Sequence, residues 1–243
     1  MRLTRCHVDM PLAVGVSLAL PESAAAHLVR VLRLGEGDPC VLFNGDGHDY
    51  AACIVEAGKR VVNVRIDSMQ AVASESPLAI TLVQGIARGE KMDLILQKAT
   101  ELGVARVMPV LAERTEVKLD AERTAKRMSH WQSVIVSACE QSGRARVPTL
   151  EAPAPLSAAA ASLESDCMKL TLDPQGEQSL KRVRVPTAGL AIAIGPEGGW
   201  SPRDRQTLQA AGFEGLRLGP RVLRTETAGL AAIAALQARF GDL

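Results

Sequence analysis

Residues 192–202 read IAIGPEGGWSP, which indicates a buried strand, a glycine turn and a helix start in that order. The apolar run over residues 189–194 is short and bounded by turn residues, as is typical of a strand buried on both faces of a sheet. Ser201 is suited to cap a helix that has Pro202 at its first position, and Asp204 completes a capping box. The glycines between strand and helix lack a Cβ, so main-chain N–H and C=O groups there can approach a ligand closely.

A second segment, residues 216–228 (LRLGPRVLRTETA), has the same order of strand, Gly-Pro turn and helix. Strand-end loops this close in sequence are expected to lie side by side at the carboxyl edge of a parallel sheet, where α/β proteins bind their ligands. Either segment alone is equally well explained as an ordinary strand-to-helix turn. The two together predict a ligand site.

The rest of the chain predicts two domains, over residues 1–70 and 77–243, joined by a polar linker. The first has short β-type runs at 41–43, 50–55 and 61–66, hairpin turns at 44–47 and 58–59, and a helix over 24–32. So many short strands must hide their edges, which favours a small β-barrel. In the second domain, strands are expected at 78–84, 104–110, 167–172, 189–194 and 216–218, and helices at 91–102, 120–142 and 225–239, with a loop and a weak helix over 149–165. This alternation favours an α/β fold with a mostly parallel sheet and helices on both faces.

The overall composition excludes several classes of protein. With 28 basic and 27 acidic residues, the chain has no overall basicity that would indicate nucleic-acid binding, so any RNA or DNA contact must come from local patches. Five cysteines without a CxxC spacing favour reduced thiols in a cytoplasmic protein, and the scattered histidines indicate no metal site. The apolar stretch at 10–20 resembles a signal peptide, but Pro11 interrupts it, and no run is long enough to span a membrane.

The common nucleotide and hydrolase fingerprints are absent. There is no P-loop, no GxGxxG after the first strand of the second domain and no GxSxG elbow, which disfavours a nucleotide-dependent oxidoreductase. Polar clusters occur at 98–101, 113–118 and 140–144. Each is typical of a solvated face, but together they could line a polar cleft beside the glycine turns.

These motifs resemble the bacterial 16S ribosomal RNA uridine N3-methyltransferases of the SPOUT superfamily. The resemblance rests on the two C-terminal motifs and on 91–104 (KMDLILQKATELGV), 113–118 (ERTEVK), 140–144 (EQSGR) and 27–35 (HLVRVLRLG), and covers essentially the whole chain. It departs from the family pattern only slightly, with Asp204 in place of Glu and Val222 in place of Ile. It implies an N-terminal PUA-like RNA-binding barrel, a C-terminal α/β domain with a deep trefoil knot, a homodimer, and S-adenosylmethionine as methyl donor without a metal. An RNA-binding factor that keeps the fold but has lost catalysis is the alternative, although the intact glycines disfavour it.

The resemblance also implies a cofactor pocket. Its members would be Leu172, Ile194, Gly195, Glu197, Gly198, Leu218, Gly219, Leu223, Arg224, Thr225 and Ala228.

Methylation at uridine N3 requires loss of the imide proton. A nearby cation could lower the imide pKa, and Arg224 and Arg221 are the candidates; a carboxylate could accept the proton, and Glu226, Glu101 and Glu140 are the candidates. The expected contacts to RNA phosphates are Arg5, Arg30, Arg33, Arg88, Lys91, Arg114 and Arg144.

Overall fold

The computed structural model describes residues 4–58, 61–117 and 120–243. The chain divides into two compact units, Met1–Glu75 with Val136–Val147, and Ser76–Ile135 with Pro148–Leu243. The predicted hairpin turn at 58–59 and the cluster at 113–118 each extend partly outside the described residues. Among the described helices, none is both long and apolar enough to cross a membrane.

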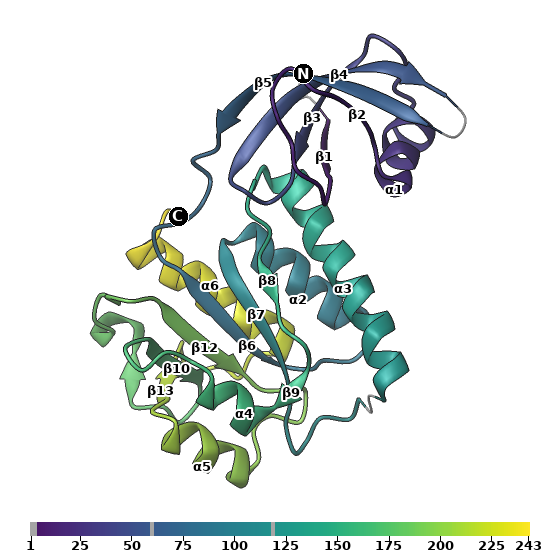
Figure 1. Cartoon of the computed structure of the whole chain (residues 1–243). Helices are drawn as coiled ribbons and strands as arrows, with labels where there is room; N and C mark the ends of the chain where they lie inside the picture. The colour runs from purple at the N-terminus through teal and green to yellow at the C-terminus, as the bar shows by residue number, and fades with distance from the viewer. Residues whose placement is uncertain (1–3, 59–60, 118–119) are drawn as a thin grey trace. The chain divides into compact units, whose positions relative to one another are not determined.

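The first unit is built on a five-stranded sheet in the order β1-β3-β4-β5-β2 (Figure 1). Its strands are β1 (Arg5–His7), β2 (Ser17–Ala19), β3 (Pro39–Phe43), β4 (His48–Ala57) and β5 (Val62–Ala71). The three predicted strands are confirmed as β3, β4 and β5. The two others, β1 and β2, have three residues each and were not predicted. The predicted helix over 24–32 is a short α-helix, α1 (Glu22–Ala25), continued by a wider π-helical segment, η1 (Ala26–Val31).

The second unit holds an eight-stranded sheet whose strand pairs are all parallel, in the order β11-β13-β10-β12-β6-β7-β8, with β9 paired to β7. Its strands are β6 (Ile80–Gly85), β7 (Val104–Leu111), β8 (Thr149–Leu150), β9 (Ala154–Pro155), β10 (Met168–Leu172), β11 (Gln178–Ser179), β12 (Leu190–Ile194) and β13 (Glu214–Arg217). Its helices are α2 (Glu90–Glu101), α4 (Leu156–Ala161), the 3-10 turn η2 (Leu180–Arg182), α5 (Pro202–Ala210) and α6 (Thr225–Phe240). The long helix α3 (Ala121–Ser142) starts in this unit, and its last turns belong to the first. The predicted parallel α/β architecture is therefore confirmed.

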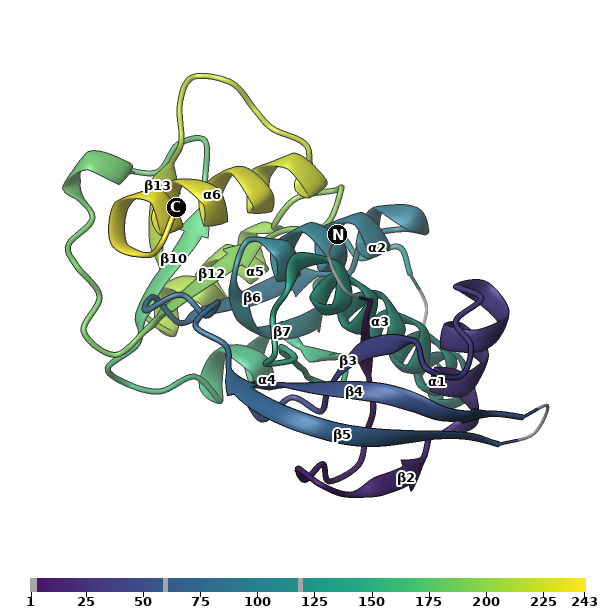
Figure 2. The ribbon, with the colours of Figure 1, turned by 90° about the horizontal axis from the view of Figure 1, so that it is seen from above.

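Helices cover both faces of this sheet (Figures 1 and 2). Helices α4 and α5 pack on one face with Val83, Ala191 and Ala193 in a common core. Helices α2 and α6 contact each other, and α6 also contacts β10 and β12. Every residue of β12 is buried, as the apolar run at 189–194 predicted for a strand enclosed on both faces.

The predicted helix start after the glycine turn is also confirmed. The Ser201 side chain accepts the N–H of Asp204 at 3.0 Å, and the Asp204 carboxylate accepts the N–H of Ser201 at 3.0 Å. The same carboxylate accepts the N–H of Glu113 at 3.3 Å. The capping box therefore also ties the start of α5 to the segment that follows β7.

Candidate active site

A cavity of about 380 Å³ opens at the carboxyl ends of β10, β12 and β13. Three chain segments form most of its wall: residues 172–174 at the end of β10, residues 194–200 (the glycine turn with its flanks) and residues 216–225. This is the edge of the sheet at which the sequence predicted a ligand site. The two Gly-Pro turns are not on neighbouring strands, however, because β10 lies between β12 and β13. The end of β10 therefore supplies a third part of the wall.

All eleven residues of the predicted cofactor pocket lie on the wall of this cavity. They are Leu172, Ile194, Gly195, Glu197, Gly198, Leu218, Gly219, Leu223, Arg224, Thr225 and Ala228. The prediction omitted several further lining residues, among them Asp173, Trp200, Arg205, Arg217 and Val222. Trp200 is part of the glycine motif, and Asp173 directly follows a predicted strand, so their positions in the sequence could have revealed them.

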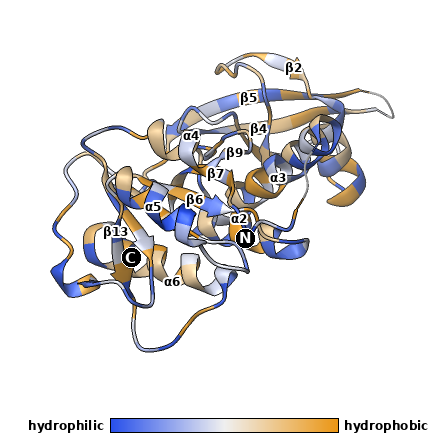
Figure 3. Ribbon diagram, turned by 90° about the horizontal axis from the view of Figure 1, so that it is seen from below, coloured by the Kyte–Doolittle hydropathy of each residue, from blue (hydrophilic) through white to orange (hydrophobic). Residues whose placement is uncertain are grey.

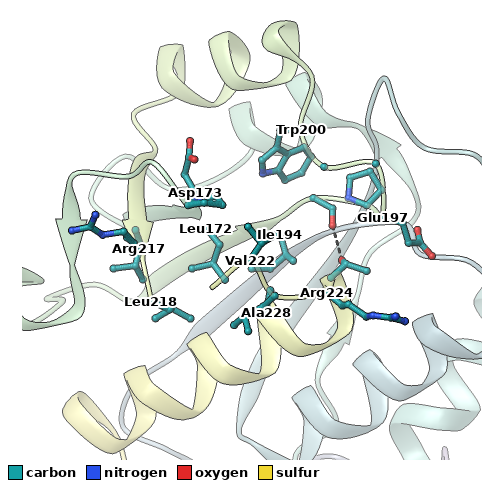
Figure 4. A pocket seen from close by; sticks show the side chains of 18 of the residues that line it. Leu172, Asp173, Ile194, Glu197, Trp200, Arg217, Leu218, Val222, Arg224 and Ala228 are labelled. Carbon is teal, nitrogen blue, oxygen red and sulfur yellow. Dashed lines mark hydrogen bonds between the residues drawn. The ribbon is translucent and has the colours of Figure 1, made fainter. Parts of the chain in front are cut away.

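The middle of the cavity is apolar. Figure 4 shows the side chains of Leu172, Ile194 and Val222 gathered there, with the Trp200 ring on one side. The indole N–H of Trp200 donates to the Thr171 hydroxyl at 3.0 Å, which fixes the orientation of a ring that is 4% exposed. Such a surface suits a flat apolar ligand group.

The glycine turn is held from outside by side chains of other elements. The Thr225 hydroxyl donates to the Gly195 carbonyl at 2.6 Å, and the Arg114 guanidinium donates to the Gly198 carbonyl at 3.0 Å. Below the turn, a Cβ at Gly85 would lie 2.5 Å from the Pro196 nitrogen, so the turn packs directly on bare backbone. The main chain of the turn is thus fixed before any ligand arrives.

Glu197, within the turn, is engaged in this scaffold. Its carboxylate accepts the Arg88 N–H at 3.0 Å and the Lys91 ammonium at 3.2 Å. Burial opposes ionisation of Glu197, but hydrogen bonds from the backbone and from Lys91 outweigh it and lower the pKa of Glu197. The carboxylate is therefore a structural anion at neutral pH.

The arginines and the carboxylates on the cavity wall differ in whether they already have partners. Arg221 and Arg224 are exposed on the cavity wall, and in the described part of the chain their guanidinium groups have no ion pair or hydrogen bond. In Figure 4, Arg224 extends away from the apolar centre. Of the carboxylates on the wall, Glu197 is bound to Lys91, and Asp173 forms an ion pair with Arg205.

The predicted proton acceptors lie outside the cavity wall. Glu226 has one buried carboxylate oxygen without a partner in the described structure, and Glu101 pairs with Lys98 at 2.9 Å. Glu140 accepts the His7 N–H at 3.0 Å within the first unit. Of the three polar clusters that were expected to line a cleft, residues 140–144 belong to the first unit.

Two of the predicted phosphate contacts need correction. Arg5 and Arg144 are 8% and 4% exposed, so neither presents a guanidinium surface to RNA. Arg5 donates to Asp49 at 2.7 Å and to the Arg144 carbonyl at 3.2 Å, while Arg144 pairs with Glu75 at 2.5 Å. Both are structural, because buried guanidinium groups need such partners.

The other predicted phosphate contacts remain exposed or partly engaged. Arg30 and Arg33 lie on the surface of the first unit, with Arg33 at a positive φ of 58°. Arg88 pairs with Glu116, and Lys91 with Glu197.

Three of the cysteines are buried thiols whose protonated form is favoured. Burial raises the pKa of Cys6 to about 12, that of Cys40 to about 11 and that of Cys139 to about 12. All five cysteines are free. Within residues 4–58, 61–117 and 120–243, no group of His, Cys, Asp and Glu is arranged to hold a metal ion.

Comparison with known proteins matches both parts of the chain. Residues 74–237 match an RNA methyltransferase domain, and residues 20–67 match an RNA methyltransferase PUA domain. Ribosomal RNA small subunit methyltransferase E of Buchnera aphidicola subsp. Schizaphis graminum is 31% identical, over 100% of this chain and 98% of that protein.

Two solved structures are similar over their full length. A putative methyltransferase from Legionella pneumophila in complex with S-adenosylmethionine has a TM-score of 0.96 and 41% identity, covering 100% of both chains. Ribosomal RNA small subunit methyltransferase E from Neisseria gonorrhoeae bound to S-adenosylmethionine has a TM-score of 0.96 and 39% identity, covering 99% of both chains.

Proposed function

The chain belongs to the RNA methyltransferase family in which a PUA domain precedes a SPOUT-type α/β domain, and from this we propose that it methylates N3 of a uridine in 16S ribosomal RNA of the small subunit. S-adenosylmethionine would be the methyl donor. The single observation that carries the proposal is the convergence of all eleven predicted pocket residues on one cavity at the carboxyl edge of the sheet.

The residues of the cavity fit this cofactor. Leu172, Ile194 and Leu218 give an apolar wall for the adenine, and a volume of about 380 Å³ is within the range of small-molecule sites. Gly199 and Gly219 have φ values of 66° and 152°, and a Cβ on either would meet nothing within 4 Å. The bare main chain thus leaves room for a ligand to approach its polar groups.

When bound, S-adenosylmethionine would supply a methyl group attached to a sulfonium. Its leaving group is a neutral thioether, which needs no metal to stabilise it. Positioning of the acceptor is then the main task of the protein. Because uridine N3 lies in the base-pairing edge, the target base must be unpaired or flipped out of its stack.

We assign the activation of the acceptor to Arg224. Its guanidinium is free in the described structure and stands at the start of α6, where the helix N-terminus adds further positive potential. A cation beside the base would lower the pKa of the imide, so that the N3 proton passes to water and N3 becomes nucleophilic near neutral pH. The two wall carboxylates are already ion-paired, which makes a cation the better supported choice over a carboxylate base.

The RNA backbone would be held by exposed arginines. Arg217 and Arg221 line the cavity of the second unit, and Arg30 and Arg33 lie on the surface of the PUA domain. Phosphate contacts of this kind orient the substrate without reading its sequence.

A homodimer is part of the proposal. Between Thr225 and Phe240, helix α6 has only Glu226 and Arg239 as charged residues, and Figure 3 shows it mostly orange and white. Its half-buried Leu230, Ala231, Ala234 and Ala235 suit contact with a second copy. The five free thiols fit the reducing conditions of the cytoplasm, which we propose as the compartment.

The deciding experiment is methyl transfer from labelled S-adenosylmethionine onto small ribosomal subunits that lack native methylation, followed by nucleoside mass spectrometry. We expect 3-methyluridine, and protein-free 16S RNA serves as the parallel substrate. Cofactor binding without any methylated uridine would show that the acceptor is wrong. Failure to bind the cofactor would favour an RNA-binding factor without catalysis.

A further inference from the structure

Gln84, on β6, is a buried amide beneath the cavity that does not itself line the cavity. The residue is fully buried, at 0% exposure. Its Nε2 group donates to the Gly85 carbonyl at 2.8 Å and to the Thr225 hydroxyl at 3.2 Å. A carbonyl can only accept, so the nitrogen of the amide must face Gly85, and the orientation of the side chain is determined.

The Thr225 hydroxyl continues the chain of hydrogen bonds. It donates to the Gly195 carbonyl at 2.6 Å. Figure 4 shows this hydrogen bond as a dashed line, from the residue after Ile194 to the residue after Arg224. A hydroxyl has one proton, so it can donate to Gly195 while accepting from Gln84. Chains of this kind strengthen each of their members, because each bond polarises the next.

Three segments of the second unit meet in this chain of hydrogen bonds. Gln84 is in register with Ile194 in the pair of β6 and β12, Thr225 is the first residue of α6, and Gly195 begins the glycine turn. The carbonyl of Gly195 is thereby directed to Thr225, and the first turn of α6 is held against the glycine turn. Both of these segments belong to the cavity wall.

The Gln84 amide is only half satisfied in the described structure. The Gln84 Oε1 atom is buried and has no partner in the described structure. An unpartnered buried acceptor costs free energy, whereas an apolar side chain of the same size would fill the space without that cost. What the amide provides in return is the pair of hydrogen bonds from Nε2, one of which reaches Thr225 on the cavity wall.

We propose that Gln84 is a positioning residue for the cofactor, acting through the Thr225 hydroxyl to hold the Gly195 carbonyl and the start of α6 in the form that binds S-adenosylmethionine. This rests on the proposed function.

The test compares Gln84→Met and Thr225→Val, singly and together, with the control Leu82→Met on the same strand. Each replacement roughly conserves volume, and Leu82 is a fully buried residue outside the cavity wall. The measurements are the Kd for S-adenosylmethionine by calorimetry, the thermal melting temperature without ligand, and the KM for RNA.

We expect Gln84→Met to weaken cofactor binding about tenfold, with an unchanged KM for RNA and a melting temperature close to that of Leu82→Met. The double variant should lose about tenfold as well, because both substitutions break the same chain of hydrogen bonds.

Wild-type affinity in Gln84→Met, or losses that add in the double variant, would overturn the role of Gln84 and leave the proposed function intact. A wild-type protein that does not bind S-adenosylmethionine would overturn both.

Discussion

At Gly85 the glycine turn leaves room for a hydrogen atom and for nothing larger. A Cβ there would lie 2.5 Å from the Pro196 nitrogen and 2.6 Å from its Cδ, and backbone cannot move aside as a flexible side chain can. We expect Gly85→Ala to cost about 1–3 kcal/mol of stability and to weaken cofactor binding, because the turn must shift. Chemical denaturation and calorimetry measure the two effects.

The matched control for this prediction is Gly229→Ala in α6. Its Cβ would meet Ile194 Cγ1 at 3.4 Å, an ordinary contact, and alanine favours the helix. Equal losses of stability and of cofactor affinity in Gly85→Ala and Gly229→Ala would contradict the steric explanation.

Arg224 is expected to matter for turnover rather than for folding. Because its side chain is exposed and unpaired in the described structure, Arg224→Ala should leave the melting temperature nearly unchanged. The loss of a cation beside the developing imide charge should lower kcat about a hundredfold. Methyl-transfer kinetics check this, with Arg203→Ala, on the exposed side of α5, as control. Full activity in Arg224→Ala would remove the assigned role.

Glu197 is expected to stabilise the folded protein in a pH-dependent way. Its folded-state pKa is lowered below the ordinary value of 4.5, so the stabilisation is present above that value and is lost as the pH falls through the folded pKa. We expect Glu197→Gln to be less stable than the wild type near neutral pH by less than about 1 kcal/mol, since the group is partly exposed.

The difference between Glu197→Gln and the wild type should disappear in acid. Urea unfolding at a series of pH values measures it, with Glu164→Gln, on an exposed turn, as the control. A difference that persists well below pH 4.5 would speak against the ionised contact with Lys91.

At the scale of elements, the capping box couples the glycine turn to α5. Ser201→Ala removes one cap hydrogen bond and should cost about 1 kcal/mol. Asp204→Ala should cost more, because the carboxylate also accepts the N–H of Glu113 from the segment after β7. Denaturant titrations compare both with Ser157→Ala on the exposed side of α4. A smaller loss for Asp204 than for Ser201 would show that the link to Glu113 contributes nothing.

At the scale of the whole molecule, the apolar surface of α6 predicts self-association. Sedimentation velocity should give twice the 25.8 kDa of one chain at micromolar concentration. Ala234→Glu places a charge among half-buried apolar residues and should yield monomers, whereas Ala210→Glu on exposed α5 should not. A wild-type protein that sediments as a monomer would contradict the proposed dimer.

Local patterns in the sequence were enough to predict the elements that build the cavity. The strand over 189–194, the turn and the capped start of α5 follow from an apolar run, glycines and a Ser-Pro-x-Asp arrangement that lie within sixteen consecutive residues. Interactions of this kind are short-range, so neighbouring residues specify them. The lining residues came from the family resemblance, which carries three-dimensional information that periodicity does not.

Only the tertiary structure decided which distant residues meet. It placed β10 between the two Gly-Pro strands, buried Arg5 and Arg144 with carboxylate partners, and assigned 140–144 to the first unit. The link from Gln84 to Thr225 joins positions 141 residues apart, and no local pattern marks either one as a partner. Periodicity reports which face of an element is apolar, whereas the pairing of polar groups depends on where the chain returns in space.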